Sequence, residues 1–430
     1  MFFRTNKNKN KNKTKNEATS VESDGTDGQI TVAELQSDLD HIKDLCVSFF
    51  VQGLAGSFHK LAKEGADDSN PVNLQDPQDI SKFVQVLPSR KDNHYLVKLG
   101  FACASAEADL IEFVRKGLAT VDGLSALAHD FQREKIAISV EYNIPIFKTK
   151  QSLIKNVKNI IAVSSGKGGV GKSATAVNLA MALRAQGARV GILDADIYGP
   201  SIPIMLNTVN ASPQSSDNKH MIPVPAHGLV SNSIGYLVKN DHASIWRGPM
   251  ASKALTQLAN ETNWPLLDYL IVDMPPGTGD IQLTMAQQLP LTAAVIVTTP
   301  QTIALSDAEK GIAMFNKLDV PVLGIIENMS YFECPQCHHQ SHIFDKEGAQ
   351  TLVNKYEVPL LAEVPLDPAL REYSDNGRSI INEQADHVLT KIFMQGAQRL
   401  SLQMCHRLQI SDLAKHSMAS DAAQIDITQL

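Results

Sequence analysis

Residues 166–173 have the composition and spacing of a phosphate-binding loop, matching the pattern G-x-x-x-x-G-K-[ST]. A short apolar run at 160–163 precedes them, and a stretch of helical periodicity follows at 173–183. Glycines let backbone N–H groups turn toward phosphate oxygens, and a helix N-terminus adds partial positive charge. We expect Lys172 to bridge the β- and γ-phosphates of ATP, and the Ser173 hydroxyl to bind Mg²⁺. The residues expected to bind the nucleotide are Gly166, Lys167, Gly168, Gly169, Val170, Gly171, Lys172 and Ser173.

Three aspartates follow other apolar runs. Asp194 and Asp196 come after the run at 190–193, and Asp273 ends the run at 269–272. Ligand sites of α/β proteins form at the carboxyl ends of strands, so we expect the three to meet there. We expect Asp273 to bind Mg²⁺, Asp194 to bind or support it, and Asp196 to position the attacking water as a catalytic residue. The last two roles are interchangeable, and plain loop or capping carboxylates are the alternative. The Pro-Pro-Gly-Thr-Gly run after Asp273 suits a switch loop that follows the γ-phosphate.

Lys167 comes directly after the first glycine of the loop. The resulting G-K-G-G-V-G-K pattern resembles the deviant Walker-A class of P-loop ATPases. That resemblance implies that Lys167 crosses a homodimer interface to contact the partner's ATP, as an arginine finger does in other enzymes. The catalytic residues expected are therefore Lys167, Lys172 and Asp196. A solvated loop lysine is the alternative for Lys167.

A Cys-x-x-Cys pair, Cys334 and Cys337, follows the apolar run at 322–326. Such a pair is consistent with half of a zinc site, a redox pair, or half of an iron–sulfur site completed by a second subunit. Nearby histidines (His338, His339 and His342) are able to complete a zinc site. Two chains that pool their cysteines offer the four thiolates that a [4Fe–4S] cluster needs. The residues alone leave cluster and zinc open.

Residues 158–380 resemble the Mrp/ApbC family of iron–sulfur cluster carrier ATPases, which are MinD/ParA-like. The matching stretches are residues 163–173, 194–203 (DADIYGPSIP), 246–250 (WRGPM), 273–280 (DMPPGTGD), 327–330 (ENMS) and 334–337 (CPQC). The resemblance implies a homodimer that holds a [4Fe–4S] cluster on Cys334 and Cys337, hydrolyses ATP slowly and passes the cluster to apo-proteins. It also implies that Asn328 contacts the adenine.

The sequence departs from the family pattern in two places. Ala174 stands where many members have Thr, which costs little because the Mg²⁺ role falls on Ser173. His338 and His339 follow Cys337 where many members have Gly, which leaves the choice of metal more open because imidazole suits zinc.

Composition limits the classes of protein that fit. The formal net charge of −7 over 430 residues disfavours a nucleic-acid partner. The sequence has no run of about 18 apolar residues that would predict a membrane span. Its N-terminus also has no apolar stretch long enough for the core of a signal peptide. Five sparse cysteines indicate a reducing, cytoplasmic setting rather than a disulfide framework. The alternative function is a ParA/MinD-type positioning ATPase that acts on DNA or membrane without a cluster; only the lysine-rich leader favours it.

The order of the apolar runs along the sequence predicts a small domain followed by one large domain. We expect a Lys/Asn-rich disordered leader at 1–30, a small α+β domain at 31–142, a linker at 143–158, the P-loop ATPase domain at 159–400 and a polar tail at 401–430. Continuous Val/Ile-rich runs separated by helix-length segments predict an α/β fold. Its sheet is expected to be mostly parallel and flanked by helices. Within the small domain we expect helices at 32–45 and 106–118, and strands at 83–87, 94–101 and 135–141.

Overall fold

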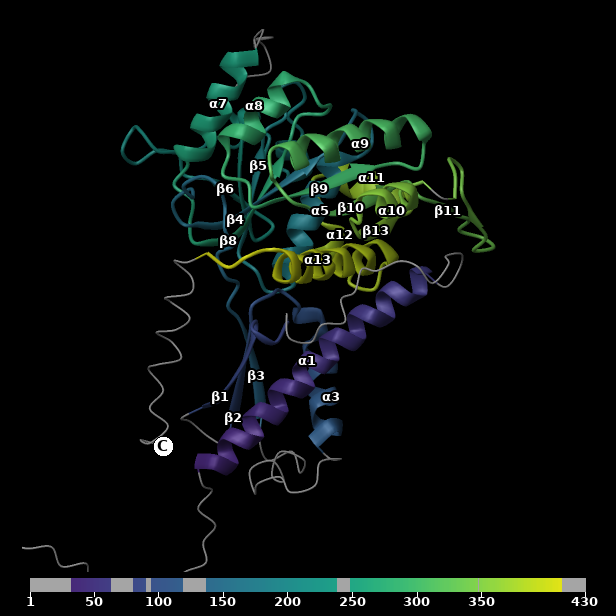
Figure 1. Ribbon diagram of the computed structural model, residues 1–430. Helices are drawn as coiled ribbons and strands as arrows, with labels where there is room; N and C mark the ends of the chain where they lie inside the picture. Colours follow the sequence, from purple (N-terminus) through teal and green to yellow (C-terminus); the bar gives the residue numbers. More distant parts are fainter. Residues whose placement is uncertain are drawn as a thin grey trace, which may run out of the picture.

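The computed structural model describes residues 32–62, 80–89, 94–118, 137–237, 248–346 and 348–411. A large α/β unit holds most of these residues, and a smaller α+β unit from the N-terminal part of the chain packs beneath it (Figure 1). The expected leader, residues 412–430 of the expected tail, and Trp246 and Arg247 lie outside the described residues.

An eight-stranded sheet forms the centre of the large unit, in the order β13-β10-β9-β4-β8-β5-β7-β6. Every neighbouring pair is parallel except β6 and β7. The strands are β4 (Val157–Ser164), β5 (Val190–Asp194), β6 (Val224–Ala226), β7 (Leu229–Ser233), β8 (Leu267–Asp273), β9 (Ala293–Thr298), β10 (Val322–Asn328) and β13 (Leu360–Val364). The expected α/β class with a mostly parallel sheet is confirmed.

Helices cover both faces of this sheet. In β4, Ile161 and Val163 enter one apolar core while Ile160 and Ala162 enter the other, as successive side chains of a strand must. The first core includes α5 (Lys172–Ala185), α6 (Ile202–Met205), α11 (Pro368–Asp375), α12 (Ile380–Glu383) and α13 (Val388–Arg407). The second includes α7 (Gly248–Asn260), α8 (Asp280–Gln288), α9 (Thr302–Lys317) and α10 (Gln350–Tyr356). Burial on both faces explains why these strands read as continuous apolar runs.

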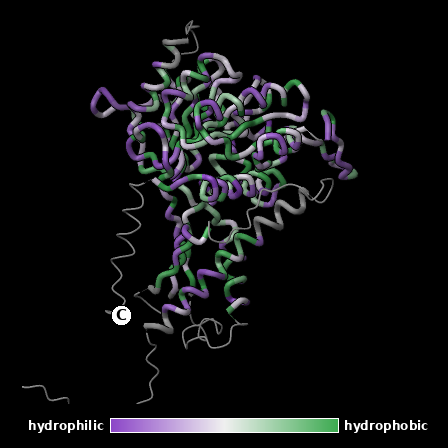
Figure 2. Tube along the Cα trace, viewed as in Figure 1, coloured by the Kyte–Doolittle hydropathy of each residue, from purple (hydrophilic) through white to green (hydrophobic). Residues whose placement is uncertain are grey.

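The smaller unit is a three-stranded sheet covered by two helices. Strand β2 (His94–Leu99) pairs antiparallel with β1 (Val84–Ser89) and parallel with β3 (Ala137–Tyr142). Helix α1 (Val32–Ala62) packs on α3 (Glu107–Leu118) and on β1, and a short 3₁₀ turn, η1 (Ala104–Ala106), precedes α3. The apolar core of this unit is continuous with the first core of the large unit. Figure 2 shows hydrophobic residues running through the interior of both units.

Two segments differ in extent from the sequence expectation. Helix α1 continues well past residue 45, and α13 continues past residue 400, where the ATPase domain was expected to end. The segment expected as a linker at 143–158 is packed rather than exposed. Its Ile144 and Phe147 are buried, and Lys148 N donates to Gln409 O (2.8 Å). The chain after α13 therefore lies against the chain before β4, and the domain boundaries remain predictions.

Among the described helices, none combines the length and apolar character that crossing a membrane requires.

Candidate functional site

The phosphate-binding loop joins the end of β4 to the start of α5, at the centre of the sheet. Gly169 and Gly171 have positive φ angles (84° and 81°), which glycine adopts without strain. A Cβ on Gly168 or Gly169 would meet nothing within 4 Å, so the space in front of the loop is open. A Cβ on Gly171 would lie 2.2 Å from Asn328 Nδ2. The loop thus presents backbone N–H groups and the N-terminus of α5 to an open space that suits phosphates.

Lys172 and Ser173, the first residues of α5, converge on Asp273 at the end of β8. Lys172 Nζ lies 2.6 Å from Asp273 Oδ1 and 3.6 Å from Asp196 Oδ2. Ser173 Oγ donates to Asp273 Oδ2 (2.6 Å). Asp196 Oδ1 is buried and has no hydrogen-bond partner among the described residues. The site holds a buried lysine among carboxylates with one carboxylate oxygen still unpaired, which suits a further cation or water.

Asp194 is fully buried, as Asp273 is, and the protein already uses both of its oxygens. Oδ2 accepts from Ser233 Oγ (2.9 Å) and Ile202 N (3.2 Å), and Oδ1 accepts from Asp196 N (3.2 Å). These bonds fix the loop that follows β5. Asp194 therefore supports the loop that carries Asp196, whereas Asp196 and Asp273 contact Lys172.

Burial shifts the pKa values of Asp194 and Asp273. Burial, with a smaller contribution from the charge of Asp273, raises the pKa of Asp194 to about 8. Burial also raises the pKa of Asp273, while the ammonium of Lys172 opposes that rise. The Lys172 ammonium alone does not return the pKa values of Asp194 and Asp273 to their ordinary range.

Lys167 lies against its own subunit in this structure. Its Nζ donates to Oε1 of Gln301, the residue before α9 (3.2 Å), and Ser165 Oγ donates to its backbone oxygen (2.9 Å). Asn328, at the end of β10, donates from Nδ2 to Val170 O (2.9 Å). Asn328 therefore braces the phosphate loop, and its predicted contact with adenine stays a prediction.

Hydrogen bonds join the loop after Asp273 to the end of β4 and the start of the phosphate loop. Met274 N donates to Val163 O and Gly277 N donates to Ser165 O, and both distances are 3.0 Å. Gln282 of α8 donates from Nε2 to Ser164 Oγ. Gly277 has φ +99°, as the tight turn in the expected switch loop requires.

Cys334 and Cys337 lie at the tip of a hairpin that projects from the large unit, formed by β11 (Phe332–Glu333) and β12 (Gln340–Ser341) (Figure 1). Figure 2 shows this hairpin as largely hydrophilic. Cys334 N donates to His339 O (3.0 Å) and His338 N to Cys334 O (2.9 Å), so the turn brings the two cysteines together. Cys337 is exposed and Cys334 half-buried. Backbone N–H groups of Cys337 and Gln336 lower the pKa of Cys334 below its ordinary value.

The neighbouring histidines do not complete a zinc site in this chain. His338 Nδ1 lies 3.0 Å from Glu333 Oε1, and His342 Nδ1 lies 3.2 Å from Ser330 O. Within the part of the chain that the structure describes, no three His, Cys, Asp or Glu side chains are arranged to hold a metal ion. The cysteine pair is thus a partial ligand set.

Three polar residues of the site were missed from the sequence. Ser233 ends β7, so the rule that flagged the aspartates at strand ends also fits it. Gln282 and Gln301 carry no such signal, because each acts through one long-range contact that spacing does not show.

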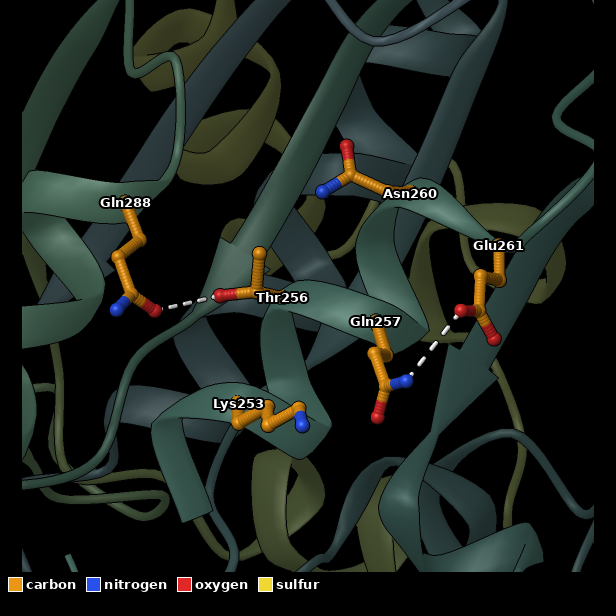
Figure 3. A pocket seen from close by; sticks show the side chains of 6 residues that line it. All are labelled: Lys253, Thr256, Gln257, Asn260, Glu261 and Gln288. Carbon is orange, nitrogen blue, oxygen red and sulfur yellow. Dashed lines mark hydrogen bonds between the residues drawn. The ribbon is translucent and has the colours of Figure 1, made fainter. Parts of the chain in front are cut away.

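A separate hollow lies between α7 and α8, away from these residues. Figure 3 shows its lining, where Thr256 Oγ1 donates to Gln288 Oε1 (2.7 Å) and Gln257 pairs with Glu261 (3.4 Å). Its volume is about 440 Å³. No residue of the phosphate site or the cysteine hairpin lines it.

The parallel sheet, the glycine loop before α5 and the Lys172–Asp273 pair define a P-loop NTPase, a nucleotide-binding ATPase scaffold. Residues 156–401 match the family model described as ParA, NUBPL iron-transfer P-loop NTPase. The chain belongs to this family.

Named relatives agree with this assignment. The iron-sulfur cluster carrier protein of Escherichia coli (strain K12) is 58% identical over 267 residues, which cover 62% of this chain and 72% of the relative. The iron-sulfur cluster transfer protein NUBPL of Mus musculus is 49% identical over 237 residues, 55% of this chain and 74% of that protein. Among solved structures, an ADP complex of a nucleotide-binding protein from Archaeoglobus fulgidus is 37% identical and covers 56% of this chain and 93% of its own, with a TM-score of 0.49. The family model and the two sequence relatives confirm the resemblance to iron–sulfur carrier ATPases.

Proposed function

We propose that this chain carries an iron–sulfur cluster on Cys334 and Cys337 and passes it to apo-proteins, with ATP binding and slow hydrolysis gating a homodimer. The cluster is cargo rather than a resident cofactor. The observation that carries the proposal is the cysteine pair, one thiol exposed and one half-buried, on a projecting hairpin of a P-loop NTPase. The names of the relatives, a carrier protein and a transfer protein, support it.

The nucleotide half of the site suits ATP with Mg²⁺. The open space before Gly168 and Gly169 fits phosphates, and Lys172 reaches that edge of the sheet. Oxygen ligands suit Mg²⁺, and the unpaired Asp196 Oδ1 and the Ser173–Asp273 pair supply them together with the phosphates. Mg²⁺ there would neutralise phosphate charge. Asp194 would support these ligands through its hydrogen bonds to the loop after β5, and Asp196 would orient the attacking water.

The cysteine half of the site needs a second copy of the chain. A [4Fe–4S] cluster takes about four thiolates, and each chain offers two on its hairpin. Cys46, Cys103 and Cys405 are buried and do not compete for iron. Thiolate ligands require a reducing compartment, for which we propose the cytoplasm.

No specific observation favours the positioning ATPase. The lysine-rich leader that motivated this alternative lies outside the described residues.

Anaerobic reconstitution tests the proposal. Iron, sulfide and zinc are measured on the same sample, and we expect about one cluster per two chains and little zinc. Cys334→Ser and Cys337→Ser should each abolish iron binding. The His338→Ala/His339→Ala variant is the matched control on the same hairpin, and four thiolate ligands predict that it keeps its iron. Stoichiometric zinc in the native chain, or iron retained by the double cysteine variant, would refute the proposal.

A further inference from the structure

The N-terminal unit contacts the rear end of the phosphate-loop helix. Gln186, the fully buried C-cap of α5, receives Ala104 N on its backbone oxygen (3.2 Å) and Ser105 N on Oε1 (2.9 Å). Its Nε2 donates to Ser105 Oγ (2.8 Å) and to Met394 O on α13 (3.1 Å). One buried side chain therefore joins the loop before α3, helix α5 and helix α13.

Close packing reinforces this contact one residue further on. Gly187 has φ +97°, and a Cβ there would lie 2.5 Å from the ring of Tyr142, which ends β3. The ring thus occupies the space that a side chain at Gly187 would need. Tyr142 OH donates to Glu107 Oε2 (3.2 Å), which anchors the ring within the N-terminal unit.

A second buried bridge reaches the strand that carries Asp273. Ser401 Oγ on α13 accepts from Ala102 N (2.9 Å) and pairs with the hydroxyl of Tyr269 (3.0 Å). Tyr269 lies in β8, which ends at Asp273 of the phosphate site. Ser401 and Tyr269 are both buried, so losing either partner would leave a buried polar group without a hydrogen bond.

The N-terminal unit therefore contacts the far end of α5 directly and reaches β8 through Ser401, and the opposite ends of α5 and β8 form the nucleotide site. Helix α5 runs from Lys172 to Ala185 over 14 residues, a rod about 21 Å long. A shift of its first turn on nucleotide binding moves Gln186 with it. Because these polar groups are buried, the loop at 102–105 must follow or lose its partners. A cavity of about 360 Å³ beside Ser105, Ala185 and Met394 leaves room for such a shift.

We propose that the N-terminal unit is a nucleotide-responsive element, coupled to the phosphate site through Gln186 on α5 and through Ser401 to β8. This inference rests on the nucleotide-binding half of the proposed function and requires no cluster. It assigns a role to the α+β unit, which contributes no residue to the phosphate site or the cysteine hairpin described above.

Hydrogen exchange on the full-length chain, with and without Mg²⁺ and a non-hydrolysable ATP analogue, tests the coupling. We expect exchange at the amides of Ala102, Ala104 and Ser105 to change by at least about threefold on nucleotide binding, as local opening couples to the site. Protection of the 166–173 amides reports binding in the same experiment. Nucleotide-dependent protection there, with no change at the three amides, would overturn the proposal.

Substitutions locate the path of the coupling. Gln186→Leu removes the side-chain bridge and should reduce the response at Ser105 by at least half, while protection at 166–173 persists; Ser105→Ala is a milder second variant. Gln403→Leu is the matched control, because Gln403 is equally buried on α13 and its side chain has no hydrogen-bond partner among the described residues. An undiminished response at Ser105 in both bridge variants would exclude this path. Cluster loading is not read here, so failure of this proposal is distinguishable from failure of the carrier function.

Discussion

Buried charge dominates the phosphate site at the scale of single residues. Lys172 is 6% exposed and lies between Asp196 and Asp273, so it compensates acids that water barely reaches. Mg²⁺ and phosphates would bring further charge of both signs to the same place. Because these charges compensate one another, removing one of the side chains leaves a buried charge unpaired, which destabilises the site.

Substitution of Lys172 should therefore abolish nucleotide binding. Lys172→Ala removes the cation expected to meet the β- and γ-phosphates and leaves Asp273 buried beside Ser173 alone. We expect ATP affinity, measured by titration calorimetry, to fall by at least about 100-fold, or some 2.7 kcal/mol. Lys253→Ala, at an exposed lysine of α7, is the control and should bind ATP normally. Comparable affinity in both variants would contradict the assignment.

Lys167 should affect turnover more than binding. Its ammonium rests on Gln301 of its own subunit, so reaching a partner's ATP requires it to leave that contact. Lys167→Ala should lower kcat by at least about tenfold with little change in ATP affinity, whereas Gln301→Ala should leave kcat unchanged or raise it. Steady-state kinetics with a binding measurement separates the two effects. Unchanged turnover in Lys167→Ala would rule out its cross-subunit role.

Strand ends organise the chemistry at the scale of elements. Asp194, Ser233, Asp273 and Asn328 all end parallel strands, and the glycine loop follows β4 at the same edge. The sequence predicted the two aspartates because buried strands read as apolar runs with polar residues after them; the family resemblance supplied Asn328, and Ser233 was missed. It did not predict Gln282, Gln301 or Gln186, whose partners are more than 80 residues away along the chain. Such contacts depend on packing, which spacing does not encode.

Glu327, near the end of β10, should make the free energy of unfolding depend on pH. Burial, opposed by the Ala349 N–H bond and aided by the charges of Glu363 and Asp345, raises the pKa of Glu327 from 4.5 to about 7. The folded chain keeps a proton that the unfolded chain releases, so this contribution is full below pH 4.5 and is lost as pH rises through 7. It amounts to about 3 kcal/mol.

Glu327→Gln should remove this pH dependence, because Gln is neutral and still offers an acceptor to Ala349 N. Denaturant unfolding at pH 5 and pH 8 measures the difference. The free energy of unfolding of the native chain should fall more between these values than that of the variant. Equal slopes would show that Glu327 ionises normally in the folded chain.

At the scale of the whole molecule, the phosphate site and the cysteine hairpin both belong to the large unit, and the small α+β unit packs beneath it. The sheet carries the phosphate site, and the cysteine hairpin follows β10, whose Asn328 braces the phosphate loop through Val170. One strand therefore both contacts the phosphate loop and leads into the hairpin. The sequence indicated the α+β unit and its position, but not its docking on α5 and α13, since the residues of that interface carry no motif.

The central claim is that two chains share one cluster while nucleotide is bound. Native mass spectrometry of the anaerobically reconstituted chain with Mg²⁺ and ATP measures chains and iron in the same particle. The account predicts a dimer holding about four iron atoms, absent from the Cys334→Ser/Cys337→Ser variant. A strictly monomeric chain that binds nucleotide and iron together would contradict it.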